Sequence, residues 1–267
     1  MSMDSSNQNV RRVFEEGFTA RDIAQALPSF DVRTPTEHAA AILRQQGCNI
    51  AGVRVDGAIA GYVDAEALHG ANCSDCRRDF APNQLVSDDM PLAPLITRLQ
   101  SQPFCFVVVW GQACGLVRRI DVQKPPGRMW LFGMVTLIES RFSRLIADNC
   151  NDDEWQACLS PGRMQKAEEL LAERQRRNQQ IELLDCLQFA DKGQIVARLE
   201  KLRRFTRFES KRQLEDIGRR LEKLRNNLAH SQSIIDGDWD TIVTLAENLE
   251  SILDRPIPMG SETPRAE

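Results

Sequence analysis

Short apolar runs and short amphipathic segments alternate along the first half of the chain. Residues 30–32 are predicted to be extended, and Glu37–Gln46 has the spacing of a helix. Two apolar runs then flank Asp56-Gly57, which is typical of a tight β-hairpin. The pattern therefore predicts a strand, a helix, a hairpin and a further short helix that begins at Asp64.

The same order of elements returns about 55 residues later, which indicates an internal repeat. An extended segment at Val86 is followed by helical spacing over Leu92–Gln100. Two apolar runs, 104–110 and 113–117, then flank a second turn, and residues 118–122 form a short helix. Ahead of both copies, Phe18 to Leu27 is predicted to form one amphipathic helix.

The pattern changes after Lys124–Arg128, a segment with two prolines and a glycine that fits neither a strand nor a helix interior. From Met129 onward the apolar residues have helical spacing. Asp191-Lys192-Gly193 is a turn signal that is expected to interrupt one of these helices. A narrow apolar seam follows it, formed by Leu214, Ile217, Leu221, Leu224 and Leu228.

The expected fold class is therefore α+β and multidomain. We expect a flexible arm over 1–12, an α/β pair over 13–128, an all-α bundle of about five helices over 129–255 and a disordered tail over 256–267. The length of 267 residues has room for about two such domains.

Composition narrows the classes of function. The chain is 42% apolar and 27% charged with a net charge of −4, which argues against indiscriminate binding of nucleic acid by the whole protein. No apolar run approaches the roughly 20 residues that span a bilayer. The polar start of the chain does not resemble a secretory signal. We therefore expect a cytoplasmic protein that does not insert into a membrane.

Eight cysteines are scattered along the chain, and Cys73-Ser-Asp-Cys76 is the one CxxC pair. A structural zinc ion needs four ligands, and a second pair at similar spacing is absent from the sequence. Cys48, His69 or a partner subunit would have to complete such a site. We therefore expect no metal site and interpret most of the cysteines as small apolar residues.

Two segments carry a resemblance to a known family. Asp56–Asp64 (DGAIAGYVD) and Gly111–Asp121 (GQACGLVRRID) resemble the strand–turn–strand–helix part of the CBS module, a small α/β unit that works in tandem pairs. The resemblance implies a tandem CBS pair, and such pairs often bind adenine nucleotides in the cleft between the copies. AMP, ADP or ATP is therefore an expected regulatory ligand.

The resemblance also implies which positions would bind this ligand. The family has Thr or Ser against the phosphate and, three residues later, Asp on the ribose hydroxyls. The first copy has Asp64 and Ala67 there, and the second has Arg118 and Asp121. Asp64, Gly115, Arg118 and Asp121 are the candidate nucleotide-binding residues, with at most one ordinary site. The alternative is a degenerate pair kept for dimerisation, in which Asp121 caps a helix.

The stretch Leu224-Arg225-Asn226-Asn227-Leu228-Ala229-His230 carries a second candidate site. A guanidinium can hold a phosphate through its planar fork of donors, and a histidine can transfer a proton near neutral pH. The alternative is a charged helix that ends in a capping histidine. From Lys192 to Arg225 there are twelve basic and five acidic residues, an excess of +7 that favours a phosphate or an acidic partner.

Arg225-x-x-x-x-His230, with Asn226 after the arginine, resembles the R-x(4–6)-H motif of HEPN domains over roughly residues 130–255. The resemblance implies a metal-independent endoribonuclease, of a toxin or antiviral type, with a composite site in a homodimer and RNA as substrate. His230 would act as acid or base, Arg225 would stabilise charge on the phosphate, and Asn226 would orient His230 or the phosphate. The expected function is nucleotide-regulated RNA cleavage without a catalytic cofactor.

A non-catalytic protein is the competing class, so the sequence leaves open whether the chain is an enzyme. In that case the protein is a nucleotide-sensing scaffold or regulatory dimer. Its basic segment would then bind nucleic acid or an acidic protein partner.

Overall fold

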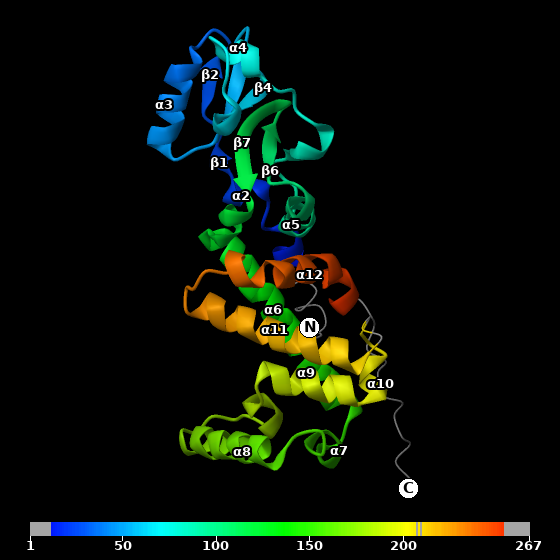
Figure 1. Ribbon diagram of the computed structural model, residues 1–267. Coiled ribbons are helices and arrows are strands. Elements are labelled where there is room, and N and C mark those ends of the chain that lie inside the picture. The colour runs from blue at the N-terminus through cyan, green and yellow to red at the C-terminus, as the bar shows by residue number, and fades with distance from the viewer. Residues whose placement is uncertain (1–11, 207, 209, 254–267) are drawn as a thin grey trace. The chain divides into compact units, whose positions relative to one another are not determined.

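A computed structural model describes residues 12–206, 208 and 210–253 (Figure 1). The chain divides into two compact units, Met1–Trp130 and Leu131–Glu267. The arm predicted over 1–12 falls outside the described residues except for its last residue. The tail predicted over 256–267 lies wholly outside them.

The first copy of the repeat forms a three-stranded sheet with one helix of eleven residues. Its elements are β2 (Ser29–Asp31), α3 (Thr36–Gln46), β3 (Ile50–Val55) and β4 (Ala58–Asp64). Strand β2 is parallel to β3, and β3 is antiparallel to β4. Helix α3 ends at Gly47, which has the left-handed backbone conformation that glycine tolerates best. The predicted order of elements is confirmed.

The second copy repeats this order and these pairings. Its elements are β5 (Leu85–Ser87), α5 (Leu92–Ser101), β6 (Phe104–Val109) and β7 (Gln112–Arg118). Strand β5 is parallel to β6, which is antiparallel to β7. The pairing of each hairpin shifts at the corresponding place, between Val53 and Arg54 in the first and between Val107 and Val108 in the second. The predicted internal repeat is therefore confirmed.

Both hairpins turn through two residues with positive φ. These residues are Asp56 and Gly57 in the first copy, with φ of 50° and 84°, and Trp110 and Gly111 in the second, with 49° and 80°. Two-residue hairpin loops of this kind match the right-handed twist of the strands. The Trp110 side chain is 99% exposed.

The segment before the first copy joins the sheet of the second copy. The helix predicted over Phe18–Leu27 is wrong in extent, because α2 covers only Ala20–Ile23 and β1 (Gln25–Ala26) follows it. Strand β1 pairs antiparallel with β7 and gives the sheet order β1-β7-β6-β5. The backbone bonds gained from β7, which include Leu27 N–H to Cys114 O at 2.9 Å, favour the extended conformation over a longer helix.

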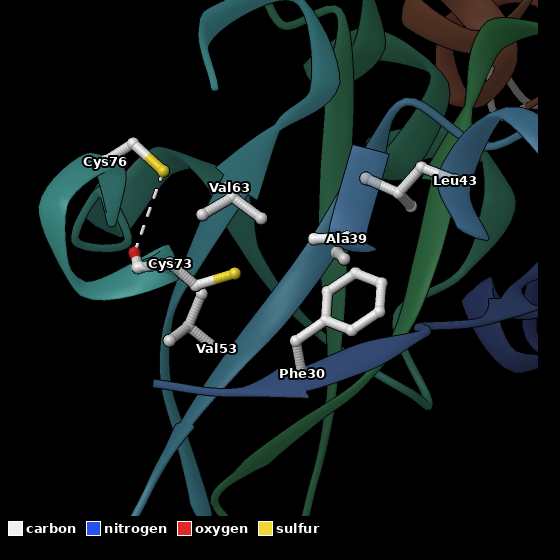
Figure 2. Packing of buried hydrophobic residues seen from close by; sticks show 8 residues of the cluster. Phe30, Ala39, Leu43, Val53, Val63, Cys73 and Cys76 are labelled. Carbon is white, nitrogen blue, oxygen red and sulfur yellow. Dashed lines mark hydrogen bonds between the residues drawn. The ribbon is translucent and has the colours of Figure 1, made fainter. Parts of the chain in front are cut away.

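The CxxC pair belongs to the hydrophobic core of the first copy (Figure 2). Helix α4 (Cys73–Cys76) places both cysteines among buried side chains that include Phe30, Val53 and Val63. Burial, and then the neighbouring thiol of Cys76, raise the pKa of Cys73. Both cysteines therefore have the surroundings of small apolar core residues.

Helices make up the described part of the second unit, and we find no strand there. They follow the helix that contains the boundary between the units, α6 (Pro125–Asn149). The two prolines before the predicted domain lie in the first turn of α6. Backbone N–H groups in a first turn have no acceptor within the helix, so proline costs no hydrogen bond there. The helices that follow are α7 (Asp152–Gln156), α8 (Pro161–Arg176), α9 (Phe189–Arg198), α10 (Glu200–Arg203), α11 (Lys211–Ala229) and α12 (Ile235–Leu253).

The turn predicted at Asp191-Lys192-Gly193 is wrong, because this segment lies inside α9. Asp191 accepts a hydrogen bond of 3.2 Å from the Gln188 N–H and so caps the helix start. Gly193 faces α11, where an added Cβ would lie 3.6 Å from the Cα of Gly218. The predicted apolar seam of α11 is confirmed, since each of its five residues is buried.

Candidate functional site

A cavity of about 230 Å³ opens in the N-terminal unit between the two copies of the repeat. Both hairpins and the connection that precedes β2 contribute to it. The polar side chains in its lining are the ones that can position a ligand. Its lining residues are Gln25, Ala26, Pro28, Cys48, Asn49, Ile50, Asp64, Glu66, Pro103, Phe104, Leu116 and Arg118.

Asp64 and Arg118 occupy equivalent positions in the two copies. Asp64 ends β4 opposite Ile50, and Arg118 ends β7 opposite Phe104. All four residues line the cavity, which is therefore built from the corresponding ends of both hairpins. The structure thus brings together two of the four residues that the sequence proposed for nucleotide binding.

The Arg118 side chain is held on two sides. Its Nη2 donates a hydrogen bond of 3.0 Å to Gln25 Oε1. Its Nε lies 3.5 Å from Asp121 Oδ2, which is an ion-pair distance, but this buried Nε has no hydrogen-bond partner. The side chain is 31% exposed, so the guanidinium combines a fixed position with access to the cavity.

Asp121 is not part of the cavity lining, and its side chain is only 1% exposed. Its Oδ1 accepts hydrogen bonds from Gln25 Nε2 at 2.7 Å and lies 3.1 Å from Lys124 Nζ. Its Oδ2 accepts from the Arg118 N–H at 2.8 Å and caps the short helix over Arg119–Gln123. The expected ribose contact does not fit this geometry, because both oxygens already have protein donors. The geometry is that of the helix-capping alternative.

Gly115 also lies outside the cavity lining. It pairs with Ala26 of β1, and an added Cβ would meet Val107 Cβ at 3.1 Å and Ala24 Cβ at 3.3 Å. A glycine at this position allows the close approach of neighbouring segments, which is a packing role. Gly115 therefore has a packing role in the structure, and its contact with a ligand stays a prediction.

The cavity also contains polar residues that the sequence analysis did not propose. Glu66 lines it two residues after Asp64, and Asp64 Oδ1 accepts a hydrogen bond of 3.1 Å from the Glu66 N–H. Gln25 reaches it from β1. The sequence signal that could have identified Glu66 is its position directly after the segment Asp56–Asp64. No local signal marked Gln25, because its position depends on pairing with β7.

In the second unit, the Arg–His motif lies at the C-terminal end of α11. Asn226 begins its last turn, Arg225 directly precedes that turn, and His230 is the C-cap residue, whose N–H donates to Asn226 O at 3.0 Å. All three side chains are exposed. Arg225 Nε lies 3.8 Å from Glu139 Oε2. The motif is therefore accessible, and His230 has the position expected for a capping histidine.

Asn227, which follows the exposed Asn226, lies in a more buried environment. Asn227 Nδ2 donates a hydrogen bond of 2.6 Å to Asp238 Oδ2 at the start of α12. Asp238 is buried, and its Oδ1 lies 3.2 Å from Lys223 Nζ. Asn227 therefore joins the end of α11 to α12, whereas Asn226 faces solvent.

The excess of positive charge over 192–225 is partly balanced by acids from outside that segment. Lys192 pairs with Glu139 at 3.2 Å, and Lys201 pairs with Glu154 at 2.6 Å. Lys223 pairs with Asp238, as described above. Part of the excess of +7 therefore has acidic partners outside the segment. The preference of this segment for phosphate is correspondingly weaker.

No described helix is both long enough and apolar enough to cross a membrane. Among the described residues, no group of three or more histidine, cysteine or acidic side chains is arranged to hold a metal ion.

Comparison with known proteins gives weak similarities only. No family model matches the chain. No curated protein matches it either. The similar solved structures reported below are all described by their CBS domains.

The CBS domain of a bacterial CNNM/CorC-family Mg²⁺ transporter, solved in complex with ATP, is 17% identical with a TM-score of 0.35; the match covers 45% of this chain and 94% of that one. The CBS-pair protein CBSX2 from Arabidopsis thaliana is 18% identical with a TM-score of 0.35. The match covers 39% of this chain and 91% of that one. A hemolysin-like protein of Oenococcus oeni PSU that contains a CBS domain is 17% identical with a TM-score of 0.34. The match covers 44% of this chain and 95% of that one.

Proposed function

We propose that the N-terminal unit is a regulatory module that binds one adenine nucleotide in the cavity between its two copies. The observation that carries the proposal is that Asp64 and Arg118, at equivalent positions of a duplicated hairpin, line one cavity. The choice of an adenine nucleotide as ligand rests on the resemblance of Asp56–Asp64 and Gly111–Asp121 to the CBS module.

The two residues offer complementary chemistry within one cavity. Arg118 can donate to a phosphate, because its position is fixed by Gln25 and Asp121. Asp64 can accept from ribose hydroxyls through the carboxylate oxygen that does not bond Glu66. Asp64 thus takes the ribose role that the sequence analysis gave to Asp121.

Isothermal titration of the full chain with AMP, ADP and ATP tests this function. Asn49→Trp places a bulky ring at the exposed rim of the cavity and should weaken binding about tenfold or more. Gln45→Trp, on the exposed face of α3, is the matched control and should bind as wild type does. The proposal fails if wild type binds none of the three nucleotides, or if Asn49→Trp binds as tightly as the control.

The second candidate function is RNA cleavage by the helical unit. What favours it is that Arg225, Asn226 and His230 are all exposed at one helix end. His230 would take the proton of a ribose 2′-hydroxyl or give one to the leaving 5′-oxygen, and Arg225 would stabilise charge on the phosphate. The products are a 2′,3′-cyclic phosphate and a 5′-hydroxyl. A homodimer would combine two such motifs into one site.

Incubating the purified full chain with mixed RNA in EDTA tests this second function. Wild type should release fragments that end in a cyclic phosphate, and His230→Ala should lose at least about a hundredfold in rate. His38→Ala removes another exposed histidine, on α3, and is the control that should keep full activity. Intact RNA with wild type, or equal cleavage by His230→Ala, would favour the non-catalytic scaffold.

The two functions together make a nucleotide-regulated nuclease. A nucleotide changes the cleavage rate only if it binds one arrangement of the protein more tightly than another. Adding the nucleotide that titration identifies to the RNA assay tests this coupling. An unchanged rate at saturating nucleotide would separate the two activities.

A further inference from the structure

We infer that the cavity selects a nucleoside monophosphate over a triphosphate, with Asp64 and Glu66 as the residues that determine this specificity. The inference rests on the proposed nucleotide-binding function and names its ligand more narrowly. Two independent properties of the cavity support it, the charge of its lining and its size.

The lining has more negative than positive charge. Asp64 and Glu66 each contribute a carboxylate, and Arg118 is the one basic residue among the twelve that line the cavity. The Arg118 charge is already engaged by the buried carboxylate of Asp121, which Lys124 also contacts. One guanidinium in this setting can balance a single phosphate. A second and a third phosphate would have to be accommodated in a cavity whose lining includes two acidic residues.

Like charges repel one another when they lie several ångströms apart at a partly solvated site. Hydroxyl groups, in contrast, donate favourably to carboxylates. Asp64 therefore suits a ribose, and Arg118 suits the single phosphate attached to it.

The size of the cavity points in the same direction. Its volume of about 230 Å³ lies below the usual range of roughly 300–1,000 Å³ for small-molecule sites. A compact ligand fits such a space better than one with an extended triphosphate. The lining also includes Ile50, Phe104 and Leu116, which can pack against a flat base.

Titration of the full chain with adenosine, AMP, ADP and ATP in EDTA tests the inference. AMP should bind about tenfold or more tightly than ATP, and ADP should lie between them. Adenosine should bind more weakly than AMP, because it does not engage Arg118.

Two isosteric variants test the assigned residues. Asp64→Asn keeps an oxygen that can accept from the Glu66 N–H, and Glu66→Gln keeps the shape of the side chain. Each variant should reduce the preference for AMP over ATP by about threefold to tenfold, mainly by improving ATP binding. Glu37→Gln removes an exposed carboxylate from α3 and should leave the preference unchanged.

The outcomes separate this inference from the function on which it rests. If no adenine ligand binds wild type, the proposed function fails, and the specificity fails with it. If ATP binds as tightly as AMP, the function stands and the specificity is wrong. If AMP is preferred but neither Asp64→Asn nor Glu66→Gln changes the ratio, the assignment to these residues is wrong. Thermal melting of each variant confirms that it is folded before titration.

Discussion

Gln25 and Asp121, 96 residues apart, are joined by a hydrogen bond of 2.7 Å from Nε2 to Oδ1. Gln25 belongs to the strand that precedes the first copy of the repeat, and Asp121 belongs to the short helix that ends the second. Gln25 Oε1 also accepts from Arg118 Nη2, so one amide holds both the buried carboxylate and the cavity arginine. The position of Arg118 in the cavity thus depends on a side chain that is distant in sequence.

Asp121→Ala should destabilise the protein. The substitution leaves Gln25 Nε2, the Arg118 N–H and Lys124 Nζ without their common acceptor in a buried place. The expected loss is about 2–4 kcal/mol in the free energy of unfolding, measured by urea denaturation of the full chain. Asp79→Ala, which removes an exposed partner of Arg77, should cost less than about 0.5 kcal/mol. Equal stability of the two variants would contradict the structural role of Asp121.

The two asparagines of the Arg–His motif should differ in their effects. Asn227→Ala removes the donor at 2.6 Å from buried Asp238 and should cost about 1–2 kcal/mol in the free energy of unfolding. Asn226→Ala should change that free energy by less than about 0.5 kcal/mol, because the side chain is exposed. Urea denaturation compares the two. In the RNA assay the order should reverse among folded variants, with the larger loss of cleavage for Asn226→Ala.

The pKa of Glu222 predicts a dependence of stability on pH. Burial, and then the negative charge of Asp191, raise this pKa above its usual value of 4.5, against the opposing effects of Arg163, the Ala190 N–H and Arg225. The unfolded chain releases this proton more readily than the folded protein does. The stability that protonated Glu222 supplies is therefore fully present when the pH is below the usual pKa of 4.5. It is lost as the pH rises through the raised pKa of the folded protein.

Glu222→Gln should consequently be more stable than wild type at pH 7, and the difference should shrink as the pH falls toward 4. The free energy of unfolding of both proteins at a series of pH values measures this. Glu173→Gln on exposed α8 is a suitable control for the general effect of losing a carboxylate. A Glu222→Gln variant that is less stable than wild type at pH 7, with a difference that vanishes on acidification, would show that the pKa of Glu222 is lowered instead.

The cysteines should differ widely in reactivity toward alkylating reagents. Burial raises the pKa of Cys105 to about 11, and burial also raises that of Cys73, so few thiolates form at either residue near pH 8. Cys114 is exposed. Mass spectrometry after brief treatment with iodoacetamide at pH 8 should find Cys114 modified and both buried residues unmodified. All three should react in denaturant. Rapid modification of Cys73 in the native protein would contradict its place in the core.

Local patterns were sufficient to predict the repeat and its hairpins. Asp56-Gly57 supplies the left-handed turn conformation directly, and the flanking apolar runs supply the strands. Strand β1 could not be predicted in this way. It has two residues, and its extended conformation depends on β7, whose Leu116 pairs with Gln25. Propensity over Phe18–Leu27 favours a helix, but the distant partner determines the outcome.

The candidate sites show the same division between local and distant information. Asp64 and Arg118 follow from their places in the repeated segment, and the cavity contains both. The sequence left a choice between a ligand role and a capping role for Asp121, and its oxygens contact the distant Gln25 as well as Arg118 and Lys124 at the two ends of its own short helix. The charge count over 192–225 did not include acidic partners outside that segment, for a related reason. Glu139 and Glu154 are far from that segment in sequence, yet their carboxylates pair with its lysines.

The opposite charges at the two equivalent cavity positions have a consequence for the binding curve. A symmetric pair would offer two similar sites related by the repeat, whereas Asp64 in one copy and Arg118 in the other admit the ligand in one orientation. Each chain then takes up a single ligand molecule, and its saturation curve is hyperbolic. Any sigmoidal response to nucleotide concentration must arise between chains, so its steepness would vary with protein concentration as they associate.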